Sequence, residues 1–321
     1  MNSAGEPAAW LRTPLARACS IALIFAASLI LGAPARAAGR AECSTVPSKI
    51  LRRSIPYCIL LPPSYDSDKT RRYPILYFLH GLGENAQILL NSGGWDLIQD
   101  LWSDHRIGEF LILTPSADDS FYINSLNGRD DYQSFFIREF LPYIEHHYRT
   151  RDERRERGVG GVSMGGYGAL RFAFLYPQIF GSVSVHSAAL IEQPDARIAP
   201  SVADTITQFM GTAFGSPFNR AYWIRESPFT IVKTHPRPAG LKIYFDCGTD
   251  DSFGFNRGAV KFHELLDSRN IPNEFHLYPG SHNWQYFAQH LPASLEFQSR
   301  AFGLNPAGGT PARPRRSSKD R

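Results

Sequence analysis

One serine of the chain, Ser163, stands in the residue pattern of a serine nucleophile. The stretch Gly161-Val162-Ser163-Met164-Gly165 reads G-x-S-x-G, in which small residues on either side let a sharp strand-to-helix turn close. Such a turn exposes the hydroxyl at a helix N-terminus, where the dipole favours the negative charge that develops during acyl transfer. The alternative interpretation is a glycine-rich loop whose serine only caps the helix.

A serine hydroxyl is a weak nucleophile unless a base accepts its proton and a carboxylate orients that base. Downstream of Ser163, the stretch "FDCGTDDSFG" carries Asp246, Asp250 and Asp251, and "YPGSHNWQYF" carries His282. Both stretches follow predicted strands, and ligands gather at the carboxyl ends of parallel strands. Each residue alone fits ordinary turn or helix-end chemistry. The chain order serine, acid, histidine predicts a catalytic triad.

The segment Phe78–Asn85, "FLHGLGEN", leaves an early predicted strand with two glycines. Glycines let backbone amides point at a ligand, and an oxyanion hole takes one amide from such a loop and one from the residue after the nucleophile. The sequence therefore predicts the backbone N–H groups of Leu82 and Met164 as oxyanion donors. His80 lies at the strand end before the loop, and we interpret it as a structural histidine that holds the loop.

The elements that must position these residues alternate along the chain from about Ser54. Continuous apolar runs favour strands buried on both faces of a parallel sheet. Because helical patterns separate these runs, the sequence predicts an α/β fold with a mostly parallel sheet and helices on both faces. The predicted strands are 73–80, 109–115, 157–162, 182–187, 241–248 and an edge strand at 273–280, and the predicted helices are 132–148, 165–177, 256–270 and 283–303.

Two features interrupt this pattern. Pro142 lies inside the first predicted helix and is expected to bend it. The segment Glu192–Pro238 contains short helical pieces and many prolines, and we expect an insertion over the carboxyl edge of the sheet.

The N-terminus has the layout of a secretory signal peptide. Two arginines precede an apolar run from Ala18 to Ala33, and Ala35-Arg36-Ala37 fits a cleavage site. The run is short for crossing a bilayer, so we expect cleavage after Ala37, with an uncleaved anchor as the alternative. The predicted organisation is a signal peptide at 1–37, a single α/β-hydrolase domain at 38–304 and a disordered basic tail at 305–321. A secreted or periplasmic location follows, without stable membrane insertion.

The formal net charge is +4, and much of the basic excess lies near the two ends of the chain. Nucleic-acid binding therefore has little support. No spacing of cysteine and histidine resembles a metal site, and we expect neither metal nor cofactor. An exported protein can keep a disulfide. Cys43–Cys58 is the most favoured pair, because both residues lie in the N-terminal segment, and Cys247 would then be a buried free thiol.

Several stretches together resemble the esterase family of α/β-hydrolases that includes esterase D-type S-formylglutathione hydrolases, feruloyl esterases and secreted mycolyltransferases. They are "YPILYFLHGLGEN", "YQSFFIREFLPYIEHHY", "GGVSMGGYGALRFAFLYPQIFGSVSVHS", "YFDCGTDDSF" and "PGSHNWQYF". The resemblance spans roughly Leu51 to Gly303. It implies Ser163 as nucleophile, His282 as general base and Asp251, three residues after the glycine of "CGTDD", as the acid. It also supports Leu82 and Met164 as oxyanion donors.

The substrate is less defined by the sequence. We expect a small-molecule or glycan ester, such as an acylated carbohydrate or an aryl ester, because export argues against the cytoplasmic substrate S-formylglutathione. Tyr122, in the stretch 117–132, and Trp284, beside His282, are candidates for an aromatic substrate pocket, with core packing as the alternative. An acyltransferase on the same scaffold and a non-catalytic binding protein of this fold stay open as alternatives. The oligomeric state is also open.

Overall fold

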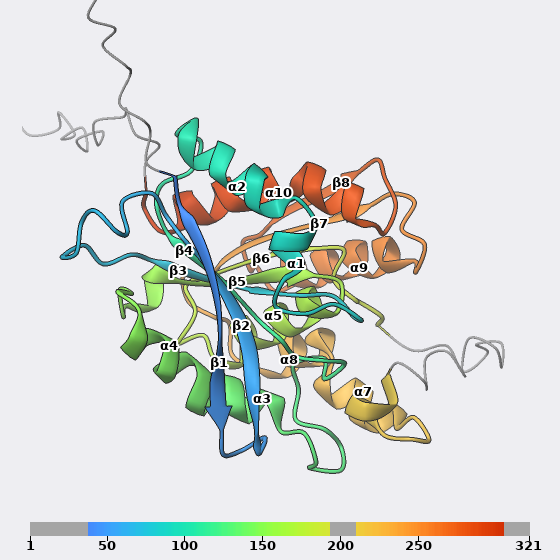
Figure 1. Cartoon of the computed structure of the whole chain (residues 1–321). Helices are drawn as coiled ribbons and strands as arrows, with labels where there is room; N and C mark the ends of the chain where they lie inside the picture. The colour runs from blue at the N-terminus through green and yellow to red at the C-terminus, as the bar shows by residue number, and fades with distance from the viewer. Residues whose placement is uncertain (1–37, 193–209, 305–321) are drawn as a thin grey trace, which may run out of the picture. The chain divides into compact units, whose positions relative to one another are not determined.

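The computed structural model describes residues 38–192 and 210–304. The described strands form one eight-stranded sheet in the order β1-β2-β4-β3-β5-β6-β7-β8 (Figure 1). Strands β3 to β8 run parallel to one another, whereas β2 is antiparallel to both β1 and β4. The strands are β1 Arg40–Ser48, β2 Arg53–Leu61, β3 Ile75–Leu79, β4 Leu111–Pro115, β5 Arg157–Val162, β6 Ser182–His186, β7 Lys242–Gly248 and β8 Glu274–Tyr278.

This sheet confirms the predicted fold class. Every residue of β3, β4 and β6 is buried, as expected for strands covered on both faces. Along β3, Ile75, Tyr77 and Leu79 pack into one apolar cluster and Leu76 and Phe78 into the other. The period of two places a core on each face of the sheet. The predicted signal peptide, 1–37, and the predicted tail, 305–321, lie outside the described residues.

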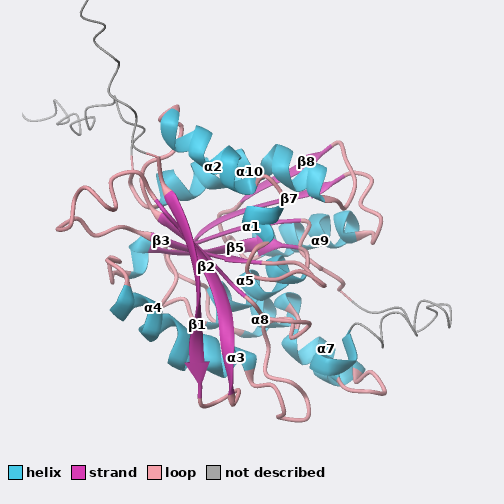
Figure 2. Ribbon diagram, in the orientation of Figure 1, coloured by secondary structure: helices cyan, strands magenta, loops and turns pink. Residues whose placement is uncertain are grey.

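Helices cover both faces of the sheet (Figure 2). One face packs against α1, α2 and α10, and the other packs against α3, α4, α5, α8 and α9. No helix within the described ranges has the length and apolar composition needed to cross a bilayer. The helix bounds are α1 Ile88–Asn91, α2 Gly94–Ser103, α3 Tyr132–Phe135, α4 Leu141–His147, α5 Met164–Leu175, α7 Arg220–Glu226, α8 Pro228–Thr234, α9 Phe255–Ser268 and α10 Trp284–Ala301, with a 3-10 turn at Arg154–Glu156.

The helix predicted over 132–148 is interrupted before Pro142. A π-helical turn, Phe136–Phe140, connects α3 to α4, and Pro142 lies in the first turn of α4. Proline donates no backbone hydrogen bond and crowds the carbonyl four residues earlier. A π turn supplies the extra residue that lets the helix continue past such a position. The bend expected at Pro142 is thus, in the structure, a π turn that shifts the register of the helix before the proline.

The part of the predicted insertion 192–238 that is described forms α7 and α8, while residues 193–209 lie outside it. Helix α8 contacts α5 and α9. Arg171 of α5 is fully buried, and its Nε donates to the carbonyl of Glu226 in α7 at 2.7 Å. The hydroxyl of Tyr167 donates to the same carbonyl at 2.8 Å. These bonds tie the insertion to the helix that follows Ser163.

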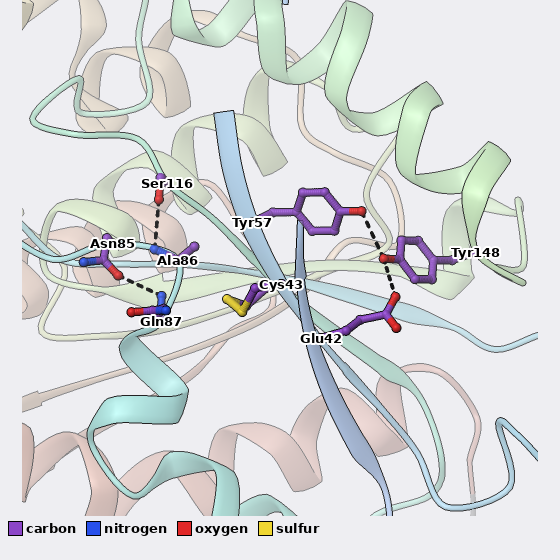
Figure 3. The surroundings of a disulfide bond; sticks show 9 residues. Glu42, Cys43, Tyr57, Asn85, Ala86, Gln87, Ser116 and Tyr148 are labelled. Carbon is purple, nitrogen blue, oxygen red and sulfur yellow. Dashed lines mark hydrogen bonds between the residues drawn. A yellow bond between two sulfur atoms is a disulfide. The ribbon is translucent and has the colours of Figure 1, made fainter. Parts of the chain in front are cut away.

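The N-terminal hairpin β1–β2 was not predicted as a strand pair. Strand β1 is largely exposed, so it lacks the apolar run that indicates a buried strand. Cys43 and Cys58 are opposite each other in this pair and form a disulfide, which confirms the predicted pairing. Beside it, Tyr57, Tyr148 and Glu42 form a chain of hydrogen bonds, at 3.0 Å between the hydroxyls and 2.7 Å to the carboxylate (Figure 3). Cys247 is a buried free thiol, as predicted.

Replacing both Cys43 and Cys58 by serine should lower the free energy of unfolding by about 3 kcal/mol. The disulfide joins residues 15 positions apart, and its loss restores conformational freedom to the unfolded chain. Urea denaturation of the oxidised protein and of the variant measures the difference. A reducing agent should bring the unaltered protein to the stability of the variant and leave the variant unchanged. Equal midpoints under oxidising conditions would contradict the prediction.

Candidate active site

Ser163 lies at the turn between β5 and α5, with the strained backbone that the motif predicts. Its φ is 54° and its ψ is −118°, a backbone conformation that residues other than glycine rarely adopt. A Cβ added at Gly161 or Gly165 would approach the carbonyl oxygen of Leu79 to 2.4 or 2.0 Å. Glycine is therefore required on both sides of the serine for the turn to close against β3.

Three backbone hydrogen bonds hold the turn. The N–H of Ser163 donates to the carbonyl of His186 at the end of β6, at 3.0 Å. The carbonyl of Ser163 accepts from the N–H of Tyr167 and of Ala189, each at 3.0 Å. A backbone strain of this kind costs about 1–3 kcal/mol, and hydrogen bonds worth about 0.5–1.5 kcal/mol each offset it. The geometry of the serine is thus set by its neighbours in the sheet.

Ser163, His282 and Asp251 come together from three loops. His282 lies between β8 and α10, and Asp251 follows β7. The Nδ1 of His282 is 2.7 Å from Asp251 Oδ2, and the Nε2 of His282 is 3.0 Å from Ser163 Oγ. An ionised carboxylate only accepts hydrogen bonds, so Nδ1 carries the proton and Nε2 accepts from the serine hydroxyl. Ser163 and His282 are partly exposed, whereas Asp251 is buried.

The carboxylate of Asp251 is surrounded by donors. Oδ1 accepts from the backbone N–H groups of Phe253 at 3.0 Å and Phe255 at 3.3 Å, and the thiol of Cys247 lies 3.6 Å from Oδ2. Burial alone would raise the pKa of Asp251, but the hydrogen bonds from His282 and the two amides outweigh it, and the net shift is downward. Asp251 thus stays ionised beside the imidazole.

Asp250 and Asp246, the two other carboxylates of the stretch, lie elsewhere. Asp250 is exposed, and its carboxylate accepts from the hydroxyl of Thr249 at 3.0 Å. Asp246 contacts His186 Nδ1 at 2.7 Å, and His186 Nε2 is 2.8 Å from Ser294 Oγ. This second Asp–His–Ser arrangement is buried, with exposures of 1, 0 and 2%, so no ester can reach it. Its members hold the end of β6 that receives the Ser163 amide.

The loop with Leu82 lies against the serine turn. A Cβ added at Gly81 would be 3.6 Å from Ser163 Cβ and 3.0 Å from Glu84 Oε2. The amide of Gly81 donates to Glu84 Oε2 at 3.0 Å, and the amide of Glu84 donates back to the carbonyl of Gly81 at 3.3 Å. Met164 is the first residue of α5, where an N–H has no partner within the helix. The oxyanion role of Leu82 and Met164 stays a prediction.

His80 is a structural histidine, as predicted. It is fully buried, its Nε2 accepts from the amide of Ala117 at 2.9 Å, and its Nδ1 contacts the carbonyl of Gly81 at 2.7 Å. Because Nε2 accepts, Nδ1–H donates, and the ring is neutral. Burial lowers the pKa of His80 from 6.5 to about 4. The ring joins the loop before Leu82 to the segment that begins at Ala117.

The two predicted aromatic substrate contacts differ in placement. Tyr122 is fully buried and its hydroxyl donates to the carbonyl of His80 at 3.1 Å. This corrects the predicted direct contact, because a side chain with no exposed surface supports the loop and does not line a pocket. Trp284 is partly buried against residues of α1 and α2, and its Nε1 donates to the carbonyl of Ser92. Its role in substrate binding stays a prediction.

Sequence reasoning missed three residues near the triad. Glu84 closes the loop by accepting from the amide three residues before it. A glutamate has the same spacing from the first residue of a helix capping box, and this spacing was a usable signal. Cys247 touches Asp251 four residues later in the chain, where no pattern predicts a contact. Phe253 lies beside His282, with ring centroids 4.8 Å apart, and the sequence offers no sign that it is exposed.

A strained serine at the end of a parallel strand, hydrogen-bonded to a histidine and an acid from later loops, is the arrangement of the α/β-hydrolases. The family described as "Putative esterase" matches residues 48–297. The chain belongs to this family.

Individual relatives agree with this assignment. Esterase Rv1288 of Mycobacterium tuberculosis is 29% identical over 244 residues, covering 70% of this chain and 51% of the relative. An acetyl esterase of Caldicellulosiruptor saccharolyticus is 24% identical over 263 residues, covering 79% of this chain and 96% of the relative. The chain thus spans about half the length of Rv1288. Among solved structures, a ferulic acid esterase superposes with a TM-score of 0.71 at 27% identity, covering 83% of this chain and 99% of the other.

The neutral state of His80 predicts a pH dependence of stability. Its folded pKa of about 4 lies below the ordinary 6.5, so the unfolded chain binds the proton more readily. The stability that this shift contributes is complete above pH 6.5 and is lost as the pH falls toward 4. Between pH 7 and pH 5 the protein should lose about 2 kcal/mol more than a His80→Gln variant. Urea denaturation at both pH values tests this, and equal losses would contradict it.

Proposed function

We propose that the protein is a serine ester hydrolase in which Ser163 is the nucleophile, His282 the general base and Asp251 the orienting acid. The observation that carries this proposal is the continuous chain of hydrogen bonds from Asp251 through His282 to Ser163, at 2.7 and 3.0 Å. It ends at Ser163, a partly exposed residue on a strained turn. The buried set around His186 has the same residue types but no exposed member, so exposure supports the choice.

The proposed roles give the following order of steps. His282 Nε2 takes the proton of the Ser163 hydroxyl as the oxygen attacks the ester carbonyl, and the ionised Asp251 stabilises the imidazolium that forms. The amides of Leu82 and Met164 donate to the oxyanion. The imidazolium then gives its proton to the departing alcohol oxygen, and an acyl group stays on Ser163. Water activated by His282 releases the acid in a second addition and elimination.

We further propose acylated carbohydrates or aryl esters as the substrate class. Relatives named acetyl esterase and ferulic acid esterase support small acyl or aryl acyl groups. A panel of acetyl, aryl and short-chain esters compared by kcat/KM tests the class. Release of free acid in the presence and absence of an alcohol acceptor tests whether water is the acceptor. Transfer to the alcohol with little free acid would contradict hydrolysis.

Replacing Ser163 by alanine should lower kcat by several orders of magnitude and abolish labelling by a fluorophosphonate probe. Asp251→Asn should lower kcat by about 10⁴-fold, as in other triads, because the amide holds the wrong histidine tautomer. Asp250→Asn is the matched control, since it changes the adjacent carboxylate, which is exposed and contacts Thr249. It should keep kcat within about twofold.

These variants separate the roles of the two aspartates. An Asp250→Asn variant as impaired as Asp251→Asn would contradict the assignment of the acid. Full esterase activity of Ser163→Ala would contradict the assignment of the nucleophile. Thermal unfolding of each variant shows whether a loss of activity reflects a loss of structure.

We also propose that the protein is exported, with the signal peptide removed after about Ala37. The apolar run Ala18–Ala33 and the small-residue cleavage pattern support this. The Cys43–Cys58 disulfide suits an oxidising compartment. Mass spectrometry of the protein from the extracellular or periplasmic fraction should give an N-terminus near Ala38. A full-length chain found in the cytoplasm with both thiols reduced would contradict export.

A further inference from the structure

One large apolar side chain at the triad is exposed. Phe253 is 67% exposed, more than Leu126, Ile224 or Leu277, the other exposed large apolar residues of the described chain. Its ring centroid lies 4.8 Å from that of His282, with the two planes at 79°. The transfer of a phenyl ring out of water is favourable. An exposed ring beside the imidazole therefore offers a binding surface for an apolar group.

The backbone of Phe253 is tied to the triad, and its ring packs beside it. The backbone N–H of Phe253 donates to Asp251 Oδ1 at 3.0 Å, and its ring stacks on the buried Phe255, with centroids 5.4 Å apart and an angle of 18°. Phe255 in turn lies 5.3 Å from the His282 ring. Phe253 is therefore held at a set distance from the proton-transferring imidazole, with much of its surface open to a ligand.

The chemistry of the triad indicates which part of an ester meets this ring. His282 must give its proton to the departing alcohol oxygen, so that oxygen lies near Nε2 in the productive complex. The acyl carbon is bonded to Ser163 at that stage, and its oxygen points to the predicted oxyanion amides. The side of the site next to the imidazole thus receives the alcohol half of the ester.

We propose that Phe253 is a specificity-determining residue that binds an apolar or aromatic face of the alcohol half of the substrate. This inference rests on the proposed function of Ser163 and His282. An aryl alcohol stacks on the ring, and so does the apolar face of a sugar ring. The acyl half makes no use of this contact, so its size is selected elsewhere in the site.

The experiment compares esters whose alcohols have similar reactivity. Ethyl acetate and 2-phenylethyl acetate differ only in the alcohol, and methyl acetate and methyl 3-phenylpropanoate differ only in the acyl group. Phe253→Ala should lower kcat/KM for 2-phenylethyl acetate about tenfold, mainly through KM. The kcat/KM of Phe253→Ala for the other three esters should stay within about twofold of that of the unaltered protein. Phe253→Trp should restore the preference for the aryl alcohol, because it restores an aromatic face.

Leu277→Ala is the control variant, because Leu277 is an exposed apolar residue of the edge strand β8, 42% exposed. Leu277→Ala should leave kcat/KM unchanged for all four esters. An equal loss for all four esters in Phe253→Ala, or a loss confined to methyl 3-phenylpropanoate, would overturn the proposal. Fluorophosphonate labelling of Phe253→Ala at the rate of the unaltered protein shows that the nucleophile is intact. Absence of turnover and labelling in the unaltered protein would refute the proposed function, and this inference with it.

Discussion

The backbone of Ser163 is the constraint on which the site depends. A φ of 54° at a residue with a side chain is unfavourable, and it persists because the turn is packed between neighbours that leave no other path. The carbonyl of Leu79 at the end of β3 lies against both flanking glycines, and the carbonyl of His186 at the end of β6 accepts the Ser163 amide. The two strands beside β5 thus place the hydroxyl where loops from β7 and β8 can reach it.

Burial, more than residue identity, separates chemistry from structure in this protein. Asp246, His186 and Ser294 have the same residue types and similar distances as Asp251, His282 and Ser163. The first set is sealed between β6, β7 and α10, where Tyr244 and Tyr286 also donate to Asp246. Buried polar groups need such partners, because an unpaired one is costly. In the second set, Ser163 and His282 are partly exposed. A pattern of residues thus becomes a candidate for catalysis only where the fold opens it to a ligand.

The sequence predicted the parallel sheet because its central strands are buried on both faces and read as apolar runs. Chain order and the ends of strands, which are visible in a sequence, predicted that Ser163, His282 and a carboxylate of the stretch 246–251 belong together, and the family resemblance implied Asp251 among the carboxylates. The sequence did not predict β1, whose exposed residues carry no apolar signal, nor the contact of Cys247 with Asp251. It left Tyr122 as a candidate either for a substrate pocket or for core packing, because an aromatic residue fits both. Only packing decides between them, and packing depends on residues distant in the chain.

The surroundings of His282 suggest why the site combines a charged acid with apolar neighbours. Phe255 and Phe287 are both buried, and the ring centre of each lies 5.3 Å from that of the imidazole. The side chain of His282 is itself only 9% exposed, so little water reaches it. Electrostatic attraction between Asp251 and an imidazolium is stronger when little water screens it. Because Phe255 and Phe287 pack against the ring of His282, the same two buried side chains orient the base and limit the screening of its pairing with the acid.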